Sequence, residues 1–205
     1  MGNTEGGGKV YNAGVKKIYT KTGDRGKTKT FLGEMSKADN LAEALGSVDE
    51  LNSWLGLCRS LIFNLKFEIL NQYSNLNAQL KNIQTNLLII GTILAGSKKY
   101  DLKIINYETR KLEKEIDKMT EELPKLTNFI YPIGDIQVAR SVCRRAERVV
   151  VRFFSGTPFG FPPNLGGKNK GGILKYLNRL GDYLFVLGRW VNRNNEIEEE
   201  VWKGY

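Results

Sequence analysis

The chain has 205 residues, of which 41% are hydrophobic, and this is enough for one soluble domain with a sizeable core. Lysine and arginine outnumber aspartate and glutamate by 31 to 22, so we expect the protein to attract anions: nucleotide phosphates, nucleic acid or acidic lipid. Histidine is absent, which excludes the commonest metal ligand, the commonest general base and any Ser/His or Cys/His nucleophilic arrangement.

The beginning of the chain is rich in glycine and polar residues. We expect residues 1–14 to form a flexible tail, without a secretory signal or a transit peptide. Residues 15–38 predict an irregular arm with one short β-like piece, Lys17 to Thr20. No apolar run approaches the roughly 20 residues that a membrane span needs, so we expect a soluble protein.

Two long amphipathic helices are predicted next, over about residues 39–64 and 70–95. Asp39 suits the N-cap of the first helix. The second helix alternates steps of four and three residues between apolar positions, which is typical of a bundle seam, and Gly96 ends it. The apolar stripes are Leu41, Leu45, Val48, Leu55 and Ile62 in the first helix and Leu76, Leu80, Ile83, Leu87, Ile90 and Leu94 in the second.

Three further helices are predicted over about residues 101–122, 135–154 and 172–194. The first of these is charged, ends before Pro124 and should lie outermost, with Ile104, Leu112, Ile116 and Met119 inward. A Gly- and Pro-rich connection, residues 155–172, precedes the last helix. The pattern predicts an all-α fold, an antiparallel five-helix bundle in a single domain over residues 15–205. Cys58 and Cys143 fall within helices, so we expect structural thiols and a reducing compartment.

Polar stripes on the last two helices are the first chemical signal. Arg140, Arg144, Glu147 and Arg148 share one face of the 135–154 helix, while Val138, Val142, Ala146 and Val149 offer an apolar side. A solvated face of Arg–Glu pairs would explain the same pattern. On the 172–194 helix, a second polar stripe interrupts an otherwise apolar sequence and favours a ligand or another subunit over simple exposure. Its members are Asn178, Asp182, Phe185 and Arg189, with Gly181 and Gly188 placed for close helix approach.

The arm is the second signal, because its glycines, threonines and lysines could wrap phosphates with backbone N–H groups and ammonium charges. Gly26, Lys27 and Thr28 resemble part of a P-loop, but Lys21 stands where the motif needs glycine and no amphipathic helix follows directly. A Walker A assignment therefore fails. A flexible basic arm without a specific ligand is the alternative.

Five segments, in order, resemble the ATP:corrinoid adenosyltransferases of the propanediol-utilisation type, also called cob(I)alamin adenosyltransferases. They are IYTKTGDRGKT (Ile18 to Thr28), GSVDELNSWLG (Gly46 to Gly56), IQTNLLIIGTILA (Ile83 to Ala95), ARSVCRRAER (Ala139 to Arg148) and YLNRLGDYLFVLGRW (Tyr176 to Trp190). The resemblance implies a homotrimer that binds ATP and the corrinoid between subunits. It also implies transfer of the 5′-deoxyadenosyl group of ATP to the cobalt of cob(I)alamin, with release of triphosphate. Because cobalt attacks C5′ of the ribose, such an enzyme needs no side-chain nucleophile.

Carried onto this sequence, the resemblance implies two groups of ATP contacts, with Mg²⁺ on the phosphates. The arm would supply Thr20, Lys21, Thr22, Gly23, Thr28, Lys29 and Lys37, and the helices Arg144, Arg145, Glu147, Arg148 and Asn178. For the corrinoid, it implies that Asp49 pairs with Arg140 across the subunit interface, that Phe129 blocks the lower face of cobalt and that Phe185 lines the pocket. Arg144, Asp49, Arg140 and Phe129 are the expected catalytic positions, and no residue is assigned to a protein-bound metal.

Two departures from the family pattern are a shortened stretch from Phe129 to Arg140 and an insertion over residues 155–172, which we expect to be a tolerated surface loop rather than a lid. The resemblance further implies a corrinoid reductase and an adenosylcobalamin-dependent mutase as cooperating proteins, in the cytoplasm or, in a eukaryote, the mitochondrial matrix. No membrane or nucleic-acid partner is expected. Two alternatives stay open: a bundle that only senses ATP or the corrinoid, and a basic helical module for nucleic acid, whose affinity would fall steeply with salt.

Overall fold

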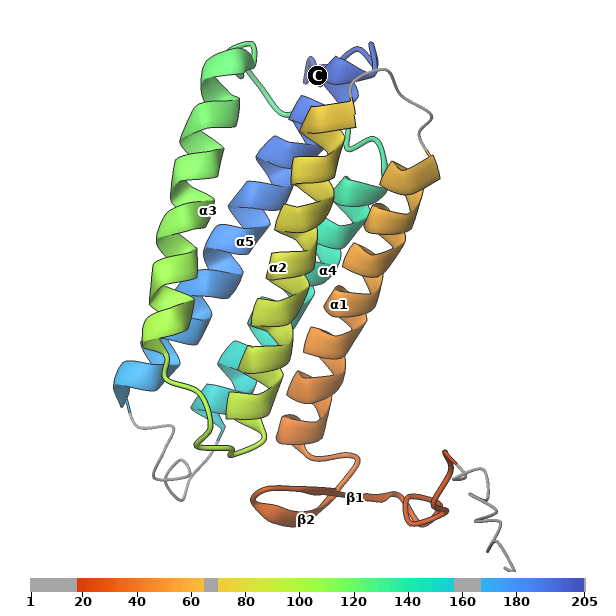
Figure 1. The fold of residues 1–205 in the computed structure, drawn as a ribbon, viewed down its shortest axis with the longest axis vertical. Helices are drawn as coiled ribbons and strands as arrows, with labels where there is room; N and C mark the ends of the chain where they lie inside the picture. The colour runs from red at the N-terminus through yellow and green to blue at the C-terminus, as the bar shows by residue number, and fades with distance from the viewer. Residues whose placement is uncertain (1–17, 65–69, 157–166, 205) are drawn as a thin grey trace, which may run out of the picture.

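Five long helices and one small hairpin make up the computed structural model, which describes residues 18–64, 70–156 and 167–204 (Figure 1). The helices are α1 (Asn40–Asn64), α2 (Leu70–Leu94), α3 (Lys103–Glu122), α4 (Asp135–Ser155) and α5 (Gly167–Asn194). They run side by side along the long axis of the molecule, which confirms the predicted all-α five-helix bundle. The predicted tail, residues 1–14, lies outside the described residues.

The packing order places the charged helix at one edge. α1 packs against α2 and α4, α4 against α5, and α5 against α3. Since α3 packs mainly on α5, it occupies the outer position that its charge predicted. In the described ranges, the structure contains no helix long and apolar enough to cross a membrane.

The apolar stripes predicted from the sequence form most of the core. Every member of the α2 seam is buried, and in α1 only Leu45 is less than fully covered. The prediction of burial is wrong for two residues: Val138 is 40% exposed and Ile104 is 42% exposed. In each case the next residue, Ala139 or Ile105, is buried instead, because a shift of one position turns a side chain by about 100° around a helix.

The arm is more ordered than expected. Its described part contains two antiparallel strands, β1 (Lys27–Thr30) and β2 (Gly33–Ser36), which pair from Lys27 with Ser36 to Thr30 with Gly33. The β-like piece expected at Lys17 to Thr20 is wrong for its described residues, which form no strand. Tertiary contact explains the hairpin: Leu32 at its tip packs so tightly on Gly96, just beyond α2, that a Cβ there would lie 2.4 Å from Leu32 Cδ2.

The fifth helix begins five residues earlier than predicted, at Gly167 instead of about 172, although Gly171 and Gly172 lie in its first turns. Glycine lowers helix propensity by about 1 kcal/mol relative to alanine, so the sequence alone disfavours this start. Packing overrides the propensity. A Cβ on Gly172 would lie 3.0 Å from the Asn106 side-chain oxygen of α3, and Ile173 beside it is fully buried.

Both cysteines lie in the core, as expected of structural thiols. Burial raises the pKa of the Cys58 thiol to about 11, with a further contribution from the charge of Asp135. Burial also raises the pKa of Cys143, whose sulfur donates to the backbone oxygen of Leu177. Neither thiol is an accessible nucleophile at neutral pH.

Candidate functional site

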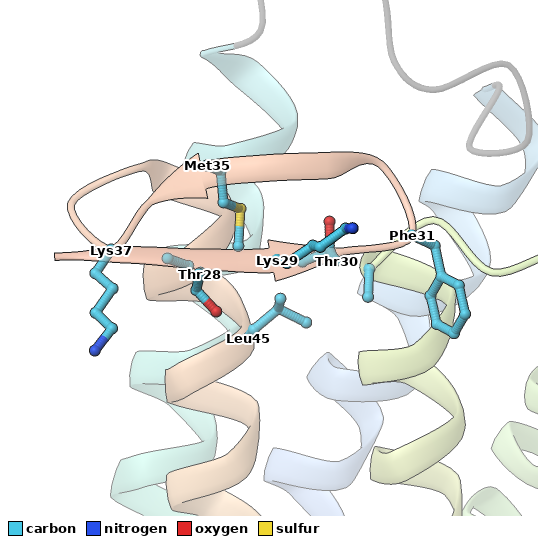
Figure 2. Close-up of a pocket in the computed structure, with 9 residues that line it drawn as sticks. Thr28, Lys29, Thr30, Phe31, Met35, Lys37 and Leu45 are labelled. Carbon is cyan, nitrogen blue, oxygen red and sulfur yellow. The ribbon is translucent and has the colours of Figure 1, made fainter. Parts of the chain in front are cut away.

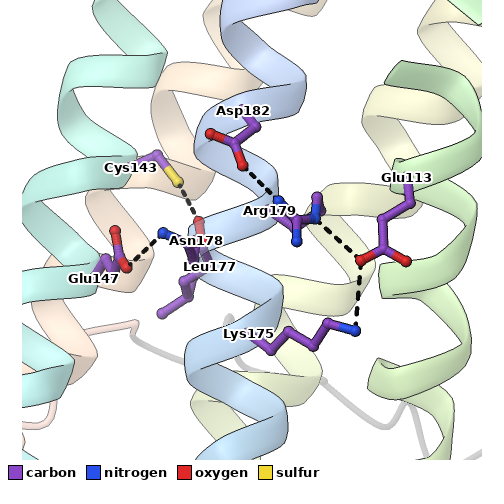
Figure 3. A network of polar contacts seen from close by, with 8 residues as sticks. All are labelled: Glu113, Cys143, Glu147, Lys175, Leu177, Asn178, Arg179 and Asp182. Carbon is purple, nitrogen blue, oxygen red and sulfur yellow. Dashed lines mark hydrogen bonds and ion pairs between the residues drawn. The ribbon is translucent and has the colours of Figure 1, made fainter. Parts of the chain in front are cut away.

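The facing sides of α4 and α5 bring together two of the expected ATP contacts. The helices are antiparallel, so Glu147 of α4 meets Asn178 of α5, and the amide Nδ2 donates to the carboxylate at 3.2 Å (Figure 3). Arg144 and Arg148 are exposed on the same side of α4, and Arg148 Nη1 donates to the backbone oxygen of Arg144 at 3.0 Å. The predicted cationic face therefore exists, with an amide and a carboxylate beside it.

Arg145 does not share that face. Its guanidinium forms an ion pair with Glu50 of α1, on the other flank of α4. Successive residues on a helix point about 100° apart, so two neighbouring arginines cannot aim at one point without bending a side chain. The expected ATP contact of Arg145 would require this ion pair to open.

Arg140 lies close to Phe185, as the two expected corrinoid positions should. The guanidinium carbon is 5.7 Å from the centre of the Phe185 ring, and Nε donates to Gln137 Oε1 at 2.9 Å. Burial, together with the charge of Arg144, lowers the pKa of Arg140 from its ordinary value. Asp49 is exposed on α1, and in the described ranges its carboxylate forms no ion pair with Arg140 or any other cation. The expected pair is therefore not made within one chain.

The arm forms a tight basic loop. The Thr20 and Thr22 hydroxyls lie 2.8 Å apart, and Lys21 adopts a positive φ of 59°. Gly23 permits close approach of Lys37: a Cβ on Gly23 would lie 2.9 Å from the Lys37 ammonium nitrogen. Lys37 N also donates to Gly26 O at 2.8 Å, which closes the loop. The Lys37 ammonium therefore lies beside the glycine-containing turn, where a phosphate could meet its charge.

Thr28, Lys29 and Lys37 also border a cavity of about 710 Å³ between the hairpin and the ends of α1 and α2. Figure 2 shows Met35 of β2 and Leu45 of α1 pointing toward one another across this space. Its lining is mixed, since apolar side chains such as Met35 and Leu45 share it with threonine and lysine side chains. Such a lining suits an amphipathic ligand.

Phe129 lies at the opposite end of the bundle from the hairpin, in the loop between α3 and α4 beside the C-terminal segment. Its side chain is 76% exposed and its ring centre is 6.2 Å from that of Trp202. Ile130 and Val201 form an isolated antiparallel bridge. This C-terminal partner was not predicted from the sequence. Trp202, a bulky residue just after the acidic run 196–200, was the available signal.

The three groups of expected site residues do not meet within one chain. The arm lies below the start of α1, the arginine face lies along α4, and Phe129 lies at the other end (Figure 1). Among residues 18–64, 70–156 and 167–204, no hydrogen bond or ion pair joins the arm positions to Arg144, Arg148 or Asn178. Within one chain, the expected site residues therefore form three separate groups.

A separate polar network ties α3 to α5 and occupies part of the predicted stripe. Glu113 accepts from Arg179 Nε at 3.1 Å and pairs with Lys175 Nζ at 3.4 Å, while Arg179 Nη1 donates to Asp182 at 2.7 Å (Figure 3). The hydrogen bond from Arg179, together with Lys175, lowers the pKa of Glu113. Asp182 is thus held by its own helix neighbour, which supports a structural role for this end of the stripe.

Comparison with known proteins decides the family. The model of the family described as cobalamin adenosyltransferase matches residues 18–191. The chain belongs to this cobalamin adenosyltransferase family. Corrinoid adenosyltransferase MMAB of Bos taurus is 37% identical over 202 residues, which cover 92% of this chain and 77% of the relative. A corrinoid adenosyltransferase of Bacillus subtilis is 35% identical, covering 88% of this chain and 89% of the relative.

Solved structures of the family share the fold. A variant of the PduO-type ATP:corrinoid adenosyltransferase from Lactobacillus reuteri, complexed with cobalamin and ATP, aligns with a TM-score of 0.75 at 30% identity. The alignment covers 92% of this chain and all of that one. A second variant of the same enzyme, complexed with ATP, aligns with a TM-score of 0.74 at 31% identity. The resemblance found in the five sequence segments is therefore confirmed.

Proposed function

We propose that this chain transfers the 5′-deoxyadenosyl group of ATP to the cobalt of cob(I)alamin, forming adenosylcobalamin and releasing triphosphate. Membership of the cobalamin adenosyltransferase family supports the reaction. One observation carries the site assignment: Asn178 donates a hydrogen bond to Glu147, and the exposed Arg144 and Arg148 lie beside this pair. This arrangement provides cations for a polyphosphate next to an amide held in place by a carboxylate.

The proposed reaction needs no side chain as a nucleophile. In the proposed reaction the reduced cobalt of the substrate is the nucleophile that attacks C5′. The lack of histidine and the burial of both cysteines, whose thiol pKa values are raised, fit a reaction without a His or Cys nucleophile. The leaving triphosphate gathers negative charge as the C5′–O bond breaks. Arg144 and Arg148, with Lys21 and Lys37 of the arm, would stabilise that charge through charge-assisted hydrogen bonds.

Magnesium would enter with the nucleotide. Among the described residues, no group of three or more His, Cys, Asp or Glu side chains could hold a metal ion. Mg²⁺ prefers to keep several waters and to bind substrate phosphates, so the chain's own contribution would be the cations and N–H groups around the complex.

The oligomer we propose is a homotrimer with sites between subunits. Two observations support sites shared between subunits: the arm and the α4 face do not meet within one chain, and Asp49 and Arg140 each present a charge without an oppositely charged partner among the described residues. The number of subunits follows from the family resemblance. We propose that Asp49 of one subunit pairs with Arg140 of its neighbour. That contact would bring Phe129 and Phe185 to the corrinoid and the arm to the arginine face.

The substrates and products define the cooperating enzymes. Cob(I)alamin is a strongly reduced species, so a corrinoid reductase must supply it, and an adenosylcobalamin-dependent mutase would consume the product. Curated relatives occur in a bacterium and in mammals. We propose that the enzyme works in a bacterial cytoplasm or, in a eukaryote, in the mitochondrial matrix.

The test is anaerobic incubation with Mg²⁺-ATP and chemically reduced cob(I)alamin, following the absorbance change to adenosylcobalamin. Arg144→Ala should lower turnover by about 10²–10³-fold, the usual cost of one donor to developing charge, and leave the oligomer intact. Arg152→Ala is the matched control, because Arg152 lies further along α4 and pairs at 3.5 Å with Glu43.

Normal turnover by Arg144→Ala would overturn the site assignment. If the unaltered chain binds ATP and cobalamin without forming adenosylcobalamin, the sensing bundle is the better function. Tight binding to nucleic acid that weakens steeply with salt would favour the alternative function, a basic helical module for nucleic acid.

A further inference from the structure

The backbone around Phe129 is held by the C-terminal segment, residues 195–204. Because the Phe129 side chain is largely exposed, core packing does not fix its ring. Instead Phe129 O accepts from Trp202 N at 2.8 Å, and Tyr131 N donates to Glu200 O at 2.9 Å. The Trp202 ring then packs on the Phe129 ring at a tilt of 57°. The direction of Phe129 therefore depends on where this segment lies.

The C-terminal segment has little packing of its own. Apart from the half-buried Asn195 and Glu199, its residues are exposed. Glu199 is fixed by Arg189 of α5, whose side chain is only 4% exposed: Nε to Oε1 is 2.5 Å and Nη2 to Oε2 is 3.0 Å. This two-point pair is the main side-chain anchor of the segment.

The same guanidinium reaches the Phe129 loop directly. Arg189 Nη2 donates to the backbone oxygen of Pro124, at the start of that loop, at 2.8 Å. Three residues on, Asn192 Nδ2 donates to Ile133 O near the end of the loop at 3.1 Å. The last turns of α5 therefore hold both ends of the loop, while the C-terminal segment holds its middle.

Arg189 also touches the second aromatic residue expected at the corrinoid. Its guanidinium carbon is 5.9 Å from the centre of the Phe185 ring, the same ring that Arg140 approaches at 5.7 Å. One buried side chain thus contacts Phe185 itself and, through Glu199 and the backbone bridge, supports Phe129.

A buried guanidinium is costly unless a carboxylate satisfies it, and a planar two-point pair accepts only a narrow range of geometries. In the observed register Glu199 meets Arg189 while Trp202 meets Phe129, so loss of the Glu199 pair would release the segment that places Trp202. The pair therefore stabilises the observed register of the bridge.

We propose that Arg189 and Glu199 are positioning residues for adenosyl transfer, which set the direction of Phe129 by holding the C-terminal segment in register. This inference rests on the proposed function. Neither residue is assigned a contact with the corrinoid, so their effect passes through Phe129.

The first experiment compares Glu199→Gln with Glu198→Gln. The first change keeps the shape of the side chain and removes its charge, and the second makes the same change at an exposed neighbour. With chemically reduced cob(I)alamin, Glu199→Gln should lower kcat/KM for the corrinoid by about tenfold to a hundredfold, a range expected for small misplacement of a positioning group. KM for ATP should stay constant, and Glu198→Gln should behave as the unaltered chain.

The decisive measurement is a double-mutant cycle with Phe129→Ala. If Glu199 acts through Phe129, Glu199→Gln should have little further effect once Phe129 is gone, measured as turnover or as cobalamin affinity from absorbance titration. An undiminished effect in that background overturns the proposal, and so does a parallel rise in KM for ATP. Trp202→Ala, which leaves the buried pair intact, should give the same corrinoid-specific loss and decides the matter if Glu199→Gln fails to fold. Inactivity of the unaltered chain would instead refute the proposed function.

Discussion

At the scale of single residues, Gly188 sets how closely α4 and α5 approach at the end of the bundle near Phe185. A Cβ at this position would lie 2.6 Å from Gln137 Nε2 and 3.1 Å from its Cδ. Gln137 joins the helices, because its Nε2 donates to Phe185 O at 3.2 Å while its Oε1 accepts from Arg140 Nε. The missing side chain of Gly188 therefore leaves room for the amide that orients Arg140.

We expect Gly188→Ala to destabilise the fold despite alanine's better helix propensity. The gain of up to about 1 kcal/mol from propensity is outweighed by overpacking, which costs typically 1–3 kcal/mol, and by the displaced hydrogen bonds of Gln137. Chemical denaturation measures the difference. Gly181→Ala is the matched control on the same helix, since its Cβ would meet Arg144 Cγ at an ordinary 3.7 Å. Equal stability of the two variants would contradict this account.

Site residues could be predicted from the sequence where the helical period alone decides. The shared face of Arg144, Glu147 and Arg148 follows from spacing, and so does the polar stripe of α5. The engagement of Arg145 by Glu50 and of Arg189 by Glu199 could not be predicted, because both depend on which segment lies alongside. The direct pairing of Glu147 with Asn178 likewise required the relative height of two antiparallel helices.

At the scale of secondary structure, helices were easier to predict than the hairpin. The α2 seam alternates apolar residues over its whole length, so its period leaves little choice. β1 and β2 have four residues each and no apolar strand pattern, and the contact between Leu32 and Gly96 that supports them is distant in sequence. The early start of α5 was not predicted for the same reason, because Gly172 of α5 packs against Asn106 of α3, which is distant in sequence.

The attachment of α3 to α5 through Glu113 should depend on pH. Arg179 lowers the pKa of Glu113 below its usual 4.5, so the ion pairs stabilise the folded state above about pH 4.5 and are lost as pH falls through the lowered value. Compared with Glu113→Gln, the unaltered chain should be more stable at neutral pH by less than about 1 kcal/mol, because the site is partly exposed.

Urea denaturation of both chains across the acid range measures this difference. The gap between them should close as pH falls below about 4.5. Glu121→Gln, on the exposed side of α3, is the control and should show no such pH-dependent gap. A gap that persists in acid would mean that Glu113 acts through shape or hydrogen bonding and not through charge.

At the scale of the whole molecule, the arm and the α4 face lie apart, and the proposed sharing of the site between subunits has a measurable consequence. Lys37→Ala should disable the half of the ATP site that the arm supplies, and Arg144→Ala should disable the half that α4 supplies. In a closed ring of three, every trimer that contains both variants has one junction where an intact arm meets an intact helix face. Random mixing of equal amounts should therefore restore about a quarter of the sites.

Co-expression of the two variants, followed by the adenosylcobalamin absorbance assay, makes this measurement. A mixture of Lys37→Ala with Lys29→Ala is the control. Both changes lie in the arm, so every subunit carries an altered arm and no junction has an intact arm. Absence of recovery in the first mixture, with hetero-oligomers confirmed by mass, would place each complete site within one chain.

Finally, the burial of Cys58 and Cys143 makes the chain suitable for site-directed labelling. Thiol reagents attack the thiolate, and both native thiols are shielded and carry raised pKa values. A cysteine introduced on the exposed surface would therefore react selectively without prior removal of native ones. Spin labels placed on the hairpin and on α4 could then report whether the two surfaces approach each other in solution as the proposed trimer requires, and a label near Trp202 could follow the C-terminal segment as cobalamin is added.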